Sequence, residues 1–354
     1  MGKPYDENEV KDLPAYKLQA RIPRTVNHVI LFGAGASYGS DARHLAEKGE
    51  LPPIGKDLFQ ALNADATLEA WSKLPDAVVQ LFSSSTFEEA MDFLDESKDW
   101  AEESFKRDID LSKFFSKFHP QPSNLYWKLA KSISRRLKGD DWTGAIMTIN
   151  YDRLIEESLI LNSVFTVVKG VTFFDDAIPS LNDNQLIEVC YPHGACQFFL
   201  GQNWFQGLGN IVFGNEAKML QKGGVNHILK YDNIPKACEL KQIPMICRYQ
   251  SSKRPSVNNY FINEQQARCT ELIMSSEKIT IVGVLCSHKT DRHIWEALEK
   301  TTAFLSYVEP GKESQESFYK WAESNNKKEN INFQVIPKTF KDAFSDIKHL
   351  HGLE

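Results

Sequence analysis

The sequence lacks any apolar run near the roughly 20 residues that a membrane-spanning helix needs. Its first residues, 1–8, are polar and contain no apolar core of a signal peptide. The net charge of −6 gives no overall basic character, so direct nucleic-acid binding is not expected, although a local basic patch stays open. We therefore expect a cytoplasmic protein without membrane contact.

Paired cysteines are also missing. None of the six cysteines belongs to a C-x-x-C pair, which argues against a four-cysteine structural zinc site. Cys190 and Cys196 flank His193, but a metal site there is the weaker interpretation, because free cysteines are commonly buried as small apolar side chains. We expect no zinc in this protein.

Apolar runs in this 354-residue chain alternate with helical patterns. The expected strands lie at 27–32, 145–149, 164–168, 186–191, 278–284 and 331–336, with helices at 153–161 and 291–306. This alternation predicts an α/β fold with a Rossmann-like, mostly parallel sheet. The composition, 42% hydrophobic and 25% charged, is that of an ordinary globular protein.

The stretch between the first two predicted strands has a helical pattern. Its two clearest apolar faces comprise Phe87, Ala90, Met91 and Leu94, and Trp127, Ala130, Ile133 and Leu137. We predict a helical insertion subdomain at about 57–140. It would lie within a single domain spanning 27–348, flanked by a lead-in at 1–26 and a tail at 349–354.

A glycine-rich turn follows the first predicted strand. It reads GAGASYG over residues 33–39, directly after the apolar run VILF. Glycine permits positive φ and close backbone approach to a ligand, and N–H groups at the start of a helix attract an anion such as a pyrophosphate. The turn therefore predicts a dinucleotide site, with an ordinary tight turn as the plainer alternative.

A dehydrogenase is not favoured. The spacing is G-x-G-x-x-x-G instead of G-x-G-x-x-G, and residues 46–55 are polar and rich in turn formers. The fingerprint of dehydrogenases needs a second apolar strand ending in an acidic residue about 20 residues on, and no strand pattern precedes Glu50. Chemistry on a dinucleotide other than hydride transfer is therefore expected.

Further motifs follow other predicted strands: TINYD at 148–152, PHG at 192–194 and the segment after Gly283. Ligands of parallel sheets bind beyond the carboxyl ends of the strands, so these motifs should converge with the glycine turn. Each residue also has a structural interpretation. Asn150 fits a turn, His193 fits a hydrogen-bonded loop, and Asp152 and Asp291 fit helix caps.

In this order, the motifs resemble those of the sirtuin superfamily. The glycine turn, TINYD and His193-Gly194 carry the likeness, and LPPIG at 51–55 and DRHIW at 291–295 resemble the divergent sirtuin-like domains of prokaryotic antiphage defence systems. Two departures from protein-deacylating sirtuins favour this branch: the paired C-x-x-C zinc module is absent, and Ile149 stands where those proteins usually carry Gln. The resemblance spans about residues 27–345.

The resemblance implies an NAD+ hydrolase that cleaves the nicotinamide–ribose bond and depletes NAD+ during phage infection, with no cofactor beyond NAD+ as substrate. Asn150 would orient the ribose or the attacking water, and His193 would act as general base. Asp152 would contact nicotinamide or support the loop. The residues expected to hold the dinucleotide are Gly33, Ala34, Gly35, Ala36, Ser37, Gly283 and Asp291.

Two other functions stay open at this point. One is an NAD-dependent protein deacylase or ADP-ribosyltransferase, and the other is a non-catalytic subunit that senses NAD or ADP-ribose. The predicted domain occupies nearly the whole chain, so we expect activation by a partner or by self-assembly into a homo-oligomer. Related systems pair such chains with a hexameric HerA-type ATPase or a short Argonaute, and the ATPase suits a standalone chain better.

Overall fold

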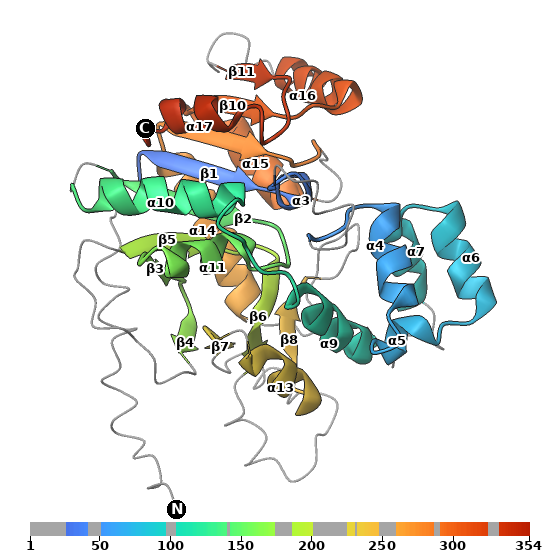
Figure 1. Cartoon of the computed structure of the whole chain (residues 1–354). Coiled ribbons are helices and arrows are strands. Elements are labelled where there is room, and N and C mark those ends of the chain that lie inside the picture. Colours follow the sequence, from blue (N-terminus) through green and yellow to red (C-terminus); the bar gives the residue numbers. More distant parts are fainter. Residues whose placement is uncertain are drawn as a thin grey trace, which may run out of the picture.

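A seven-stranded sheet forms the centre of the computed structural model (Figure 1). The structure describes residues 26–41, 51–96, 104–139, 142–173, 186–200, 225–230, 232–247, 260–286, 291–324 and 333–354, so nearly all of the predicted lead-in lies outside the described residues. The strands are β1 (His28–Phe32), β2 (Gly144–Thr148), β3 (Phe165–Val167), β5 (Leu186–Cys190), β9 (Lys278–Val282), β10 (Phe304–Val308) and β11 (Phe333–Ile336).

The strand order is β11-β10-β9-β1-β2-β5-β3, and every neighbouring pair is parallel. Parallel strands need crossover connections, which the intervening helices supply. The predicted α/β fold with a Rossmann-like, mostly parallel sheet is confirmed.

Helices cover both faces of this sheet (Figure 1). The covering helices are α10 (Leu125–Leu137), α11 (Leu154–Leu161), α14 (Tyr260–Ser275), α15 (Arg292–Lys300), α16 (Lys312–Ser324) and α17 (Phe344–Leu350). Ile30 and Phe32 pack into an apolar cluster with α10, α11 and α17, whereas Val29 and Leu31 pack into a second cluster with α14, α15 and α16. Because alternate strand residues point to opposite faces, a sheet buried on both sides is built from continuous apolar runs.

The segment between β1 and β2 is helical wherever it is described as regular structure. Its helices before α10 are α3 (Ala34–Tyr38), α4 (Lys56–Ala64), α5 (Glu69–Ser72), α6 (Asp76–Ser84), α7 (Phe87–Glu96) and α9 (Ser104–Phe115). The predicted apolar face of α7 is buried at all four positions. Helices α4 to α7 project to one side of the sheet (Figure 1). The helical insertion is therefore present, while its assignment as a subdomain with bounds at 57 and 140 stays a prediction.

The prediction of one helix over 291–306 is wrong. Helix α15 ends at Lys300, and β10 inserts between β9 and β11. Thr301 takes an extended conformation with ψ of 152°, and its hydroxyl donates to the carbonyl of Ile273 at 2.8 Å. Two β-branched threonines followed by a run containing Phe304 and Tyr307 favour an extended chain, and burial between two strands selects it.

A second sheet was not foreseen in the sequence. Its strands, in the order β4-β7-β6-β8, are β4 (Val171–Phe173), β6 (Gly194–Leu200), β7 (Val225–His227) and β8 (Pro244–Ile246). Three of them span only three residues, and β6 is buried along its whole length and so shows no alternation. Helix α13 (Asn233–Glu239) contacts β6 beside this sheet.

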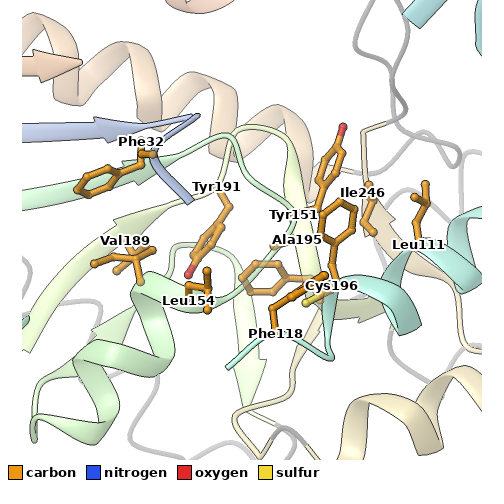
Figure 2. Packing of buried hydrophobic residues seen from close by; sticks show 14 of the residues in the cluster. Phe32, Leu111, Phe118, Tyr151, Leu154, Val189, Tyr191, Ala195, Cys196 and Ile246 are labelled. Atoms are coloured by element: carbon orange, nitrogen blue, oxygen red, sulfur yellow. The ribbon is translucent and has the colours of Figure 1, made fainter. Parts of the chain in front are cut away.

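Apolar packing joins the two sheets at the end of β5. Tyr191 is buried and meets Phe198 of β6 edge-to-face, with 4.9 Å between the ring centroids. Figure 2 shows Tyr191 above Leu154 of α11, with Phe32 and Val189 of the central sheet nearby. This packing fixes the loop that follows β5 relative to both sheets.

Buried His351 makes the stability of this fold sensitive to acid. Its Nε2 lies 2.7 Å from Thr280 Oγ1, and its ring lies 5.3 Å from the ring of His28. Burial, with a smaller contribution from nearby His28, lowers the pKa of His351 to about 3. An unfolded histidine titrates near 6.5, so the unfolded chain binds the extra proton below that pH and stability falls as pH drops. Between pH 7 and pH 5 this histidine should account for about 2 kcal/mol of lost unfolding free energy.

Urea unfolding at pH 7 and pH 5 tests this expectation. The variant His351→Gln should lose less stability than wild type between the two pH values, because a neutral amide does not titrate. His349→Gln is the control, since that histidine is 77% exposed and lies two residues away. An equal loss in wild type and His351→Gln would contradict the expectation.

Candidate functional site

Four of the motifs found in the sequence lie at one edge of the central sheet. The glycine turn follows β1, TINYD begins at the last residue of β2, PHG follows β5, and Gly283 follows β9. These four strands are adjacent and parallel, in the order β9-β1-β2-β5, so their carboxyl ends share an edge. Crevices beyond the carboxyl ends of such strands are where ligands of open α/β sheets bind.

The glycines of the turn allow two backbones to pack together. Gly33 has φ of −112° and Gly35 lies within α3, so the expected use of positive φ in this turn is wrong. A Cβ on Gly33 would lie 2.4 Å from the carbonyl oxygen of Gly283. The amide of Gly35 donates to that same oxygen at 3.1 Å, and the amide of Ala36 donates to the Gly33 carbonyl at 3.0 Å. Two amides that the turn could offer to an anion are therefore already used inside the protein.

Gly283 is the position where a side chain should do most damage. Its φ is +63°, and a Cβ there would lie 2.2 Å from the backbone nitrogen of Ala36. Gly352 offers a matched control, because its φ is +62° and a Cβ there would meet nothing within 4 Å. Gly352→Ala should cost about 1–2 kcal/mol, from backbone strain alone. Gly283→Ala should cost that strain plus about 1–3 kcal/mol for overpacking. Chemical denaturation of the two variants measures the difference, and equal costs would contradict the steric account.

Asn150 ties TINYD to the glycine turn. Its Nδ2 donates to the carbonyl oxygen of Gly33 at 3.0 Å and to Ser37 Oγ at 2.8 Å. A carbonyl oxygen can only accept, so the amide must present its NH2 group to the turn. Within the described part of the chain, the buried Oδ1 of Asn150 has no hydrogen-bond partner. A buried unpaired acceptor costs about 1–3 kcal/mol, so this oxygen is ready to accept a hydrogen bond from a ligand or water.

The hydroxyl of Ser37 links Asn150 to two other buried groups. Tyr126 Oη lies 3.1 Å from Ser37 Oγ, and Asp152 also forms a side-chain hydrogen bond with Ser37. A serine hydroxyl can accept two hydrogen bonds and donate one. Ser37 can therefore accept from Asn150 and Tyr126 while it donates to the Asp152 carboxylate.

Tyr126 was missed in the sequence analysis. The face chosen there began at Trp127, which is only half-buried. The buried face of α10 instead includes Tyr126, Leu129, Ala130 and Ile133. These positions follow the i, i+3, i+4, i+7 spacing, so the correct face was readable, although nothing in it marks the tyrosine hydroxyl as part of a site.

Asp152 accepts a hydrogen bond at the start of a helix and also faces the site. Its Oδ1 accepts a hydrogen bond from the amide of Leu154 at 3.0 Å, in the first turn of α11. Burial raises the pKa of Asp152 to about 6, and the bonds from Leu154 and Ser37 offset this only in part. The carboxylate is therefore held charged at neutral pH against the preference of its surroundings.

His193 lies next to Asp291. Its Nε2 is 3.2 Å from Asp291 Oδ1, an ion-pair contact outside the geometry of a linear hydrogen bond. The ring of His293, in the first turn of α15, lies 5.3 Å from the ring of His193. The Asp291 backbone carbonyl accepts from the amides of Ile294 and Trp295, but its side chain makes no capping bond. Interpreting the Asp291 side chain as a helix cap is therefore wrong, because the carboxylate turns to His193 instead.

Main-chain hydrogen bonds join the Asn150 and His193 loops. Cys196 donates its amide to the carbonyl of Tyr151 at 2.9 Å, and Cys247 donates its amide to the carbonyl of His193 at 2.7 Å. The hydroxyl of Tyr151 donates to the Cys247 carbonyl. The two loops are thereby held in a fixed relation through β6 and the end of β8.

The two cysteines that flank His193 are buried free thiols, and burial raises the pKa of both. Among the described residues, no group of three or more His, Cys, Asp or Glu side chains is placed to hold a metal ion. The same part of the chain contains no helix long and apolar enough to cross a membrane.

Comparisons with known proteins find likeness only among solved structures. No family model matches the chain, and no curated protein matches its sequence. A Sir2 homologue in complex with NAD is 12% identical with a TM-score of 0.44, covering 100% of this chain and 97% of that chain. A mutant Sir2 homologue in complex with ADP-ribose is 10% identical with a TM-score of 0.42, covering 98% and 97%. Sir2 bound to an acetylated peptide is 11% identical with a TM-score of 0.38, covering 97% and 100%.

Proposed function

We propose that this chain is a sirtuin-like NAD+ hydrolase that cleaves the bond between nicotinamide and ribose. The observation that carries the proposal is the state of Asn150. Its amide nitrogen is held by the glycine turn, and its buried Oδ1 is left without a partner among the described residues. An oriented acceptor at the carboxyl edge of a parallel sheet suits the positioning of a water molecule or a ribose hydroxyl.

Hydrolysis of the nicotinamide–ribose bond would give His193 and Asn150 distinct roles. When the bond between C1′ and the nicotinamide nitrogen breaks, its electron pair stays on the ring nitrogen, which loses its positive charge, and the ribose gains oxocarbenium character. Water then adds to C1′ and loses a proton. His193 would accept that proton as general base, and Asn150 Oδ1 would orient the attacking water or a ribose hydroxyl. The products are nicotinamide, ADP-ribose and a proton.

The dinucleotide would lie against the turn and the end of β9. Ala36 and Ser37 are buried, so they would shape the turn, whereas exposed Ala34 and half-buried Gly35 would face the phosphates. Gly283 would keep the two backbones close enough for this surface to form. Asp152 would contact the nicotinamide or support the loop.

The motif resemblance further leads us to propose a role in antiphage defence through NAD+ depletion. The chain would act in the cytoplasm as a homo-oligomer, activated by a hexameric HerA-type ATPase in preference to a short Argonaute. Size-exclusion chromatography with light scattering, with and without the ATPase, tests this assembly. A stable monomer in both samples would count against it.

Product analysis tests the hydrolase. Purified chain is incubated with NAD+, alone and with the ATPase, and nicotinamide and ADP-ribose are quantified by chromatography. Equal amounts of the two products are expected without any acyl peptide or protein acceptor. Release that requires an acyl-lysine peptide would indicate a deacylase, and label on a protein would indicate an ADP-ribosyltransferase. Calorimetric NAD+ binding without release in either sample would indicate a sensing subunit and overturn the proposal.

A further inference from the structure

We infer that Asp291 is a positioning residue that holds His193 with a proton on Nε2, so that Nδ1 is the nitrogen that acts as base. The role of His193 as base rests on the proposed function, whereas the pairing of the two side chains does not. Asp291 was expected to contact the dinucleotide. In the structure its carboxylate lies beside His193, and its contact with the dinucleotide stays a prediction.

The first observation is the contact itself. His193 Nε2 and Asp291 Oδ1 lie 3.2 Å apart, with side chains that are 3% and 10% exposed. A carboxylate can only accept, so its presence beside Nε2 favours the tautomer with the hydrogen on that nitrogen. The other nitrogen, Nδ1, then carries the lone pair. Catalytic hydrogen bonds are often long or poorly aligned before substrate binds, which fits the non-linear geometry of this pair.

The second observation is that the Asp291 side chain does not cap the helix that follows it. It occupies the N-cap position of α15, with φ of −116° and ψ of 40°, yet its side chain makes no capping bond. Aspartate at an N-cap usually accepts from an amide in the first helical turn. The amides of Ile294 and Trp295, in the first helical turn, donate to the backbone carbonyl of Asp291 and not to its side chain. The Asp291 carboxylate contacts His193.

The third observation is that His193 is held from its other side. Its carbonyl oxygen accepts from the amide of Cys247 at 2.7 Å. The next residue, Gly194, has φ of +68°, and a Cβ there would lie 1.7 Å from the carbonyl oxygen of Met245. The backbone of His193 is therefore fixed by β8, and the ring is fixed by Asp291 and His293 at the start of α15. A reacting group held from two elements is the arrangement that precise catalysis needs.

Nitrogen NMR tests the pairing without any turnover. The full chain is labelled with 15N-histidine, and His193 is assigned by the signals that disappear in His193→Gln. At pH 8 the wild type should show a protonated Nε2 with a slowly exchanging, downfield-shifted ring N–H proton. That proton signal should be lost in Asp291→Ser. A wild type protonated on Nδ1, or a signal unchanged in Asp291→Ser, would overturn the inference.

Kinetics separate positioning from two other roles. Asp291→Ser and Asp291→Asn should lower kcat by about 10²–10⁴-fold, as expected when a base loses its orienting carboxylate, while KM for NAD+ stays near the wild-type value. Serine is a good N-cap residue, so a purely structural role would leave Asp291→Ser near wild type. Direct contact with the ribose would instead raise KM with kcat unchanged. Either of these results would overturn the inference.

Glu296→Gln is the matched control. It makes the same change from carboxylate to amide as Asp291→Asn, within the helix that Asp291 precedes, at a residue whose contact with Arg292 lies at the surface. Its kcat and its His193 spectrum should equal those of wild type. The two proposals fail separately: a wild type that releases no nicotinamide defeats the hydrolase, and the ring N–H signal still decides the pairing.

Discussion

Asn150→Ala should lower the rate of nicotinamide release by about 10²–10³-fold at saturating NAD+. The substitution removes the unpartnered Oδ1 that would orient the attacking water or a ribose hydroxyl. It also removes the donor that fixes the Gly33 carbonyl and Ser37 Oγ, so the turn loses its link to TINYD. Initial rates measured by chromatography of nicotinamide check this result.

Asn162→Ala controls for the loss of a half-buried, hydrogen-bonded side-chain amide. Asn162 lies at the other end of α11, where its Nδ2 donates to the carbonyl of Ser158 at 2.8 Å and to that of Trp127 at 3.4 Å. Its removal should lower the unfolding free energy by about 1 kcal/mol, as for a typical hydrogen bond, and should leave the rate unchanged. If Asn150→Ala folds and retains the wild-type rate, Asn150 is a turn residue only.

The predictions from sequence succeeded where one local pattern is sufficient. Continuous apolar runs found β1, β2, β5 and β9, because strands buried on both faces need them. Strand β10 was missed because the helical pattern of α15 runs into it, and the preference of the two threonines at 301–302 for an extended chain is too weak on its own to mark the end of the helix. Its position between β9 and β11 decides its conformation. The short strands β4, β7 and β8 pair with segments distant in sequence, which local periodicity cannot show.

The same limit applies to the site. Strand ends indicated which loops come together, so Asn150 and His193 could be named in advance. The side chains that contact these two residues could not be predicted from the sequence. Ser37 and Tyr126 meet across 89 positions in sequence, and His193 meets Asp291 across nearly a hundred. Such pairs depend on the helical insertion returning to the glycine turn and on α15 starting beside the PHG loop.

Asp152→Asn should stabilise the protein and weaken its catalysis. The pKa of Asp152 is raised to about 6 by burial, so the folded state binds its proton more tightly than the unfolded state does. Stability therefore falls as pH rises from about 4 to 6, and at pH 7 the charged carboxylate costs the fold about 3 kcal/mol. Asparagine removes that charge and keeps an Oδ1 that can cap Leu154. We expect a gain of about 1–3 kcal/mol at pH 7, shrinking to about half at pH 5.

The expected loss of nicotinamide release in Asp152→Asn is about 10–10²-fold, the worth of a hydrogen bond to a charged group. Urea unfolding at the two pH values and initial rates at pH 7 measure both effects on one preparation. Asp76→Asn is the control, since Asp76 is exposed in the first turn of α6 and should change neither quantity.

The effects of Asp152→Asn on stability and on nicotinamide release together distinguish a helix cap from a functional carboxylate. A residue that only caps α11 would gain stability as asparagine and lose no activity, because the amide oxygen replaces the carboxylate in the bond to Leu154. Asp152→Ala would then cost about 1 kcal/mol relative to asparagine through loss of the cap. A charge kept in a buried position at the expense of stability, with activity lost when it is removed, is the signature of a functional group. A stabilised and fully active Asp152→Asn would reduce Asp152 to a helix cap.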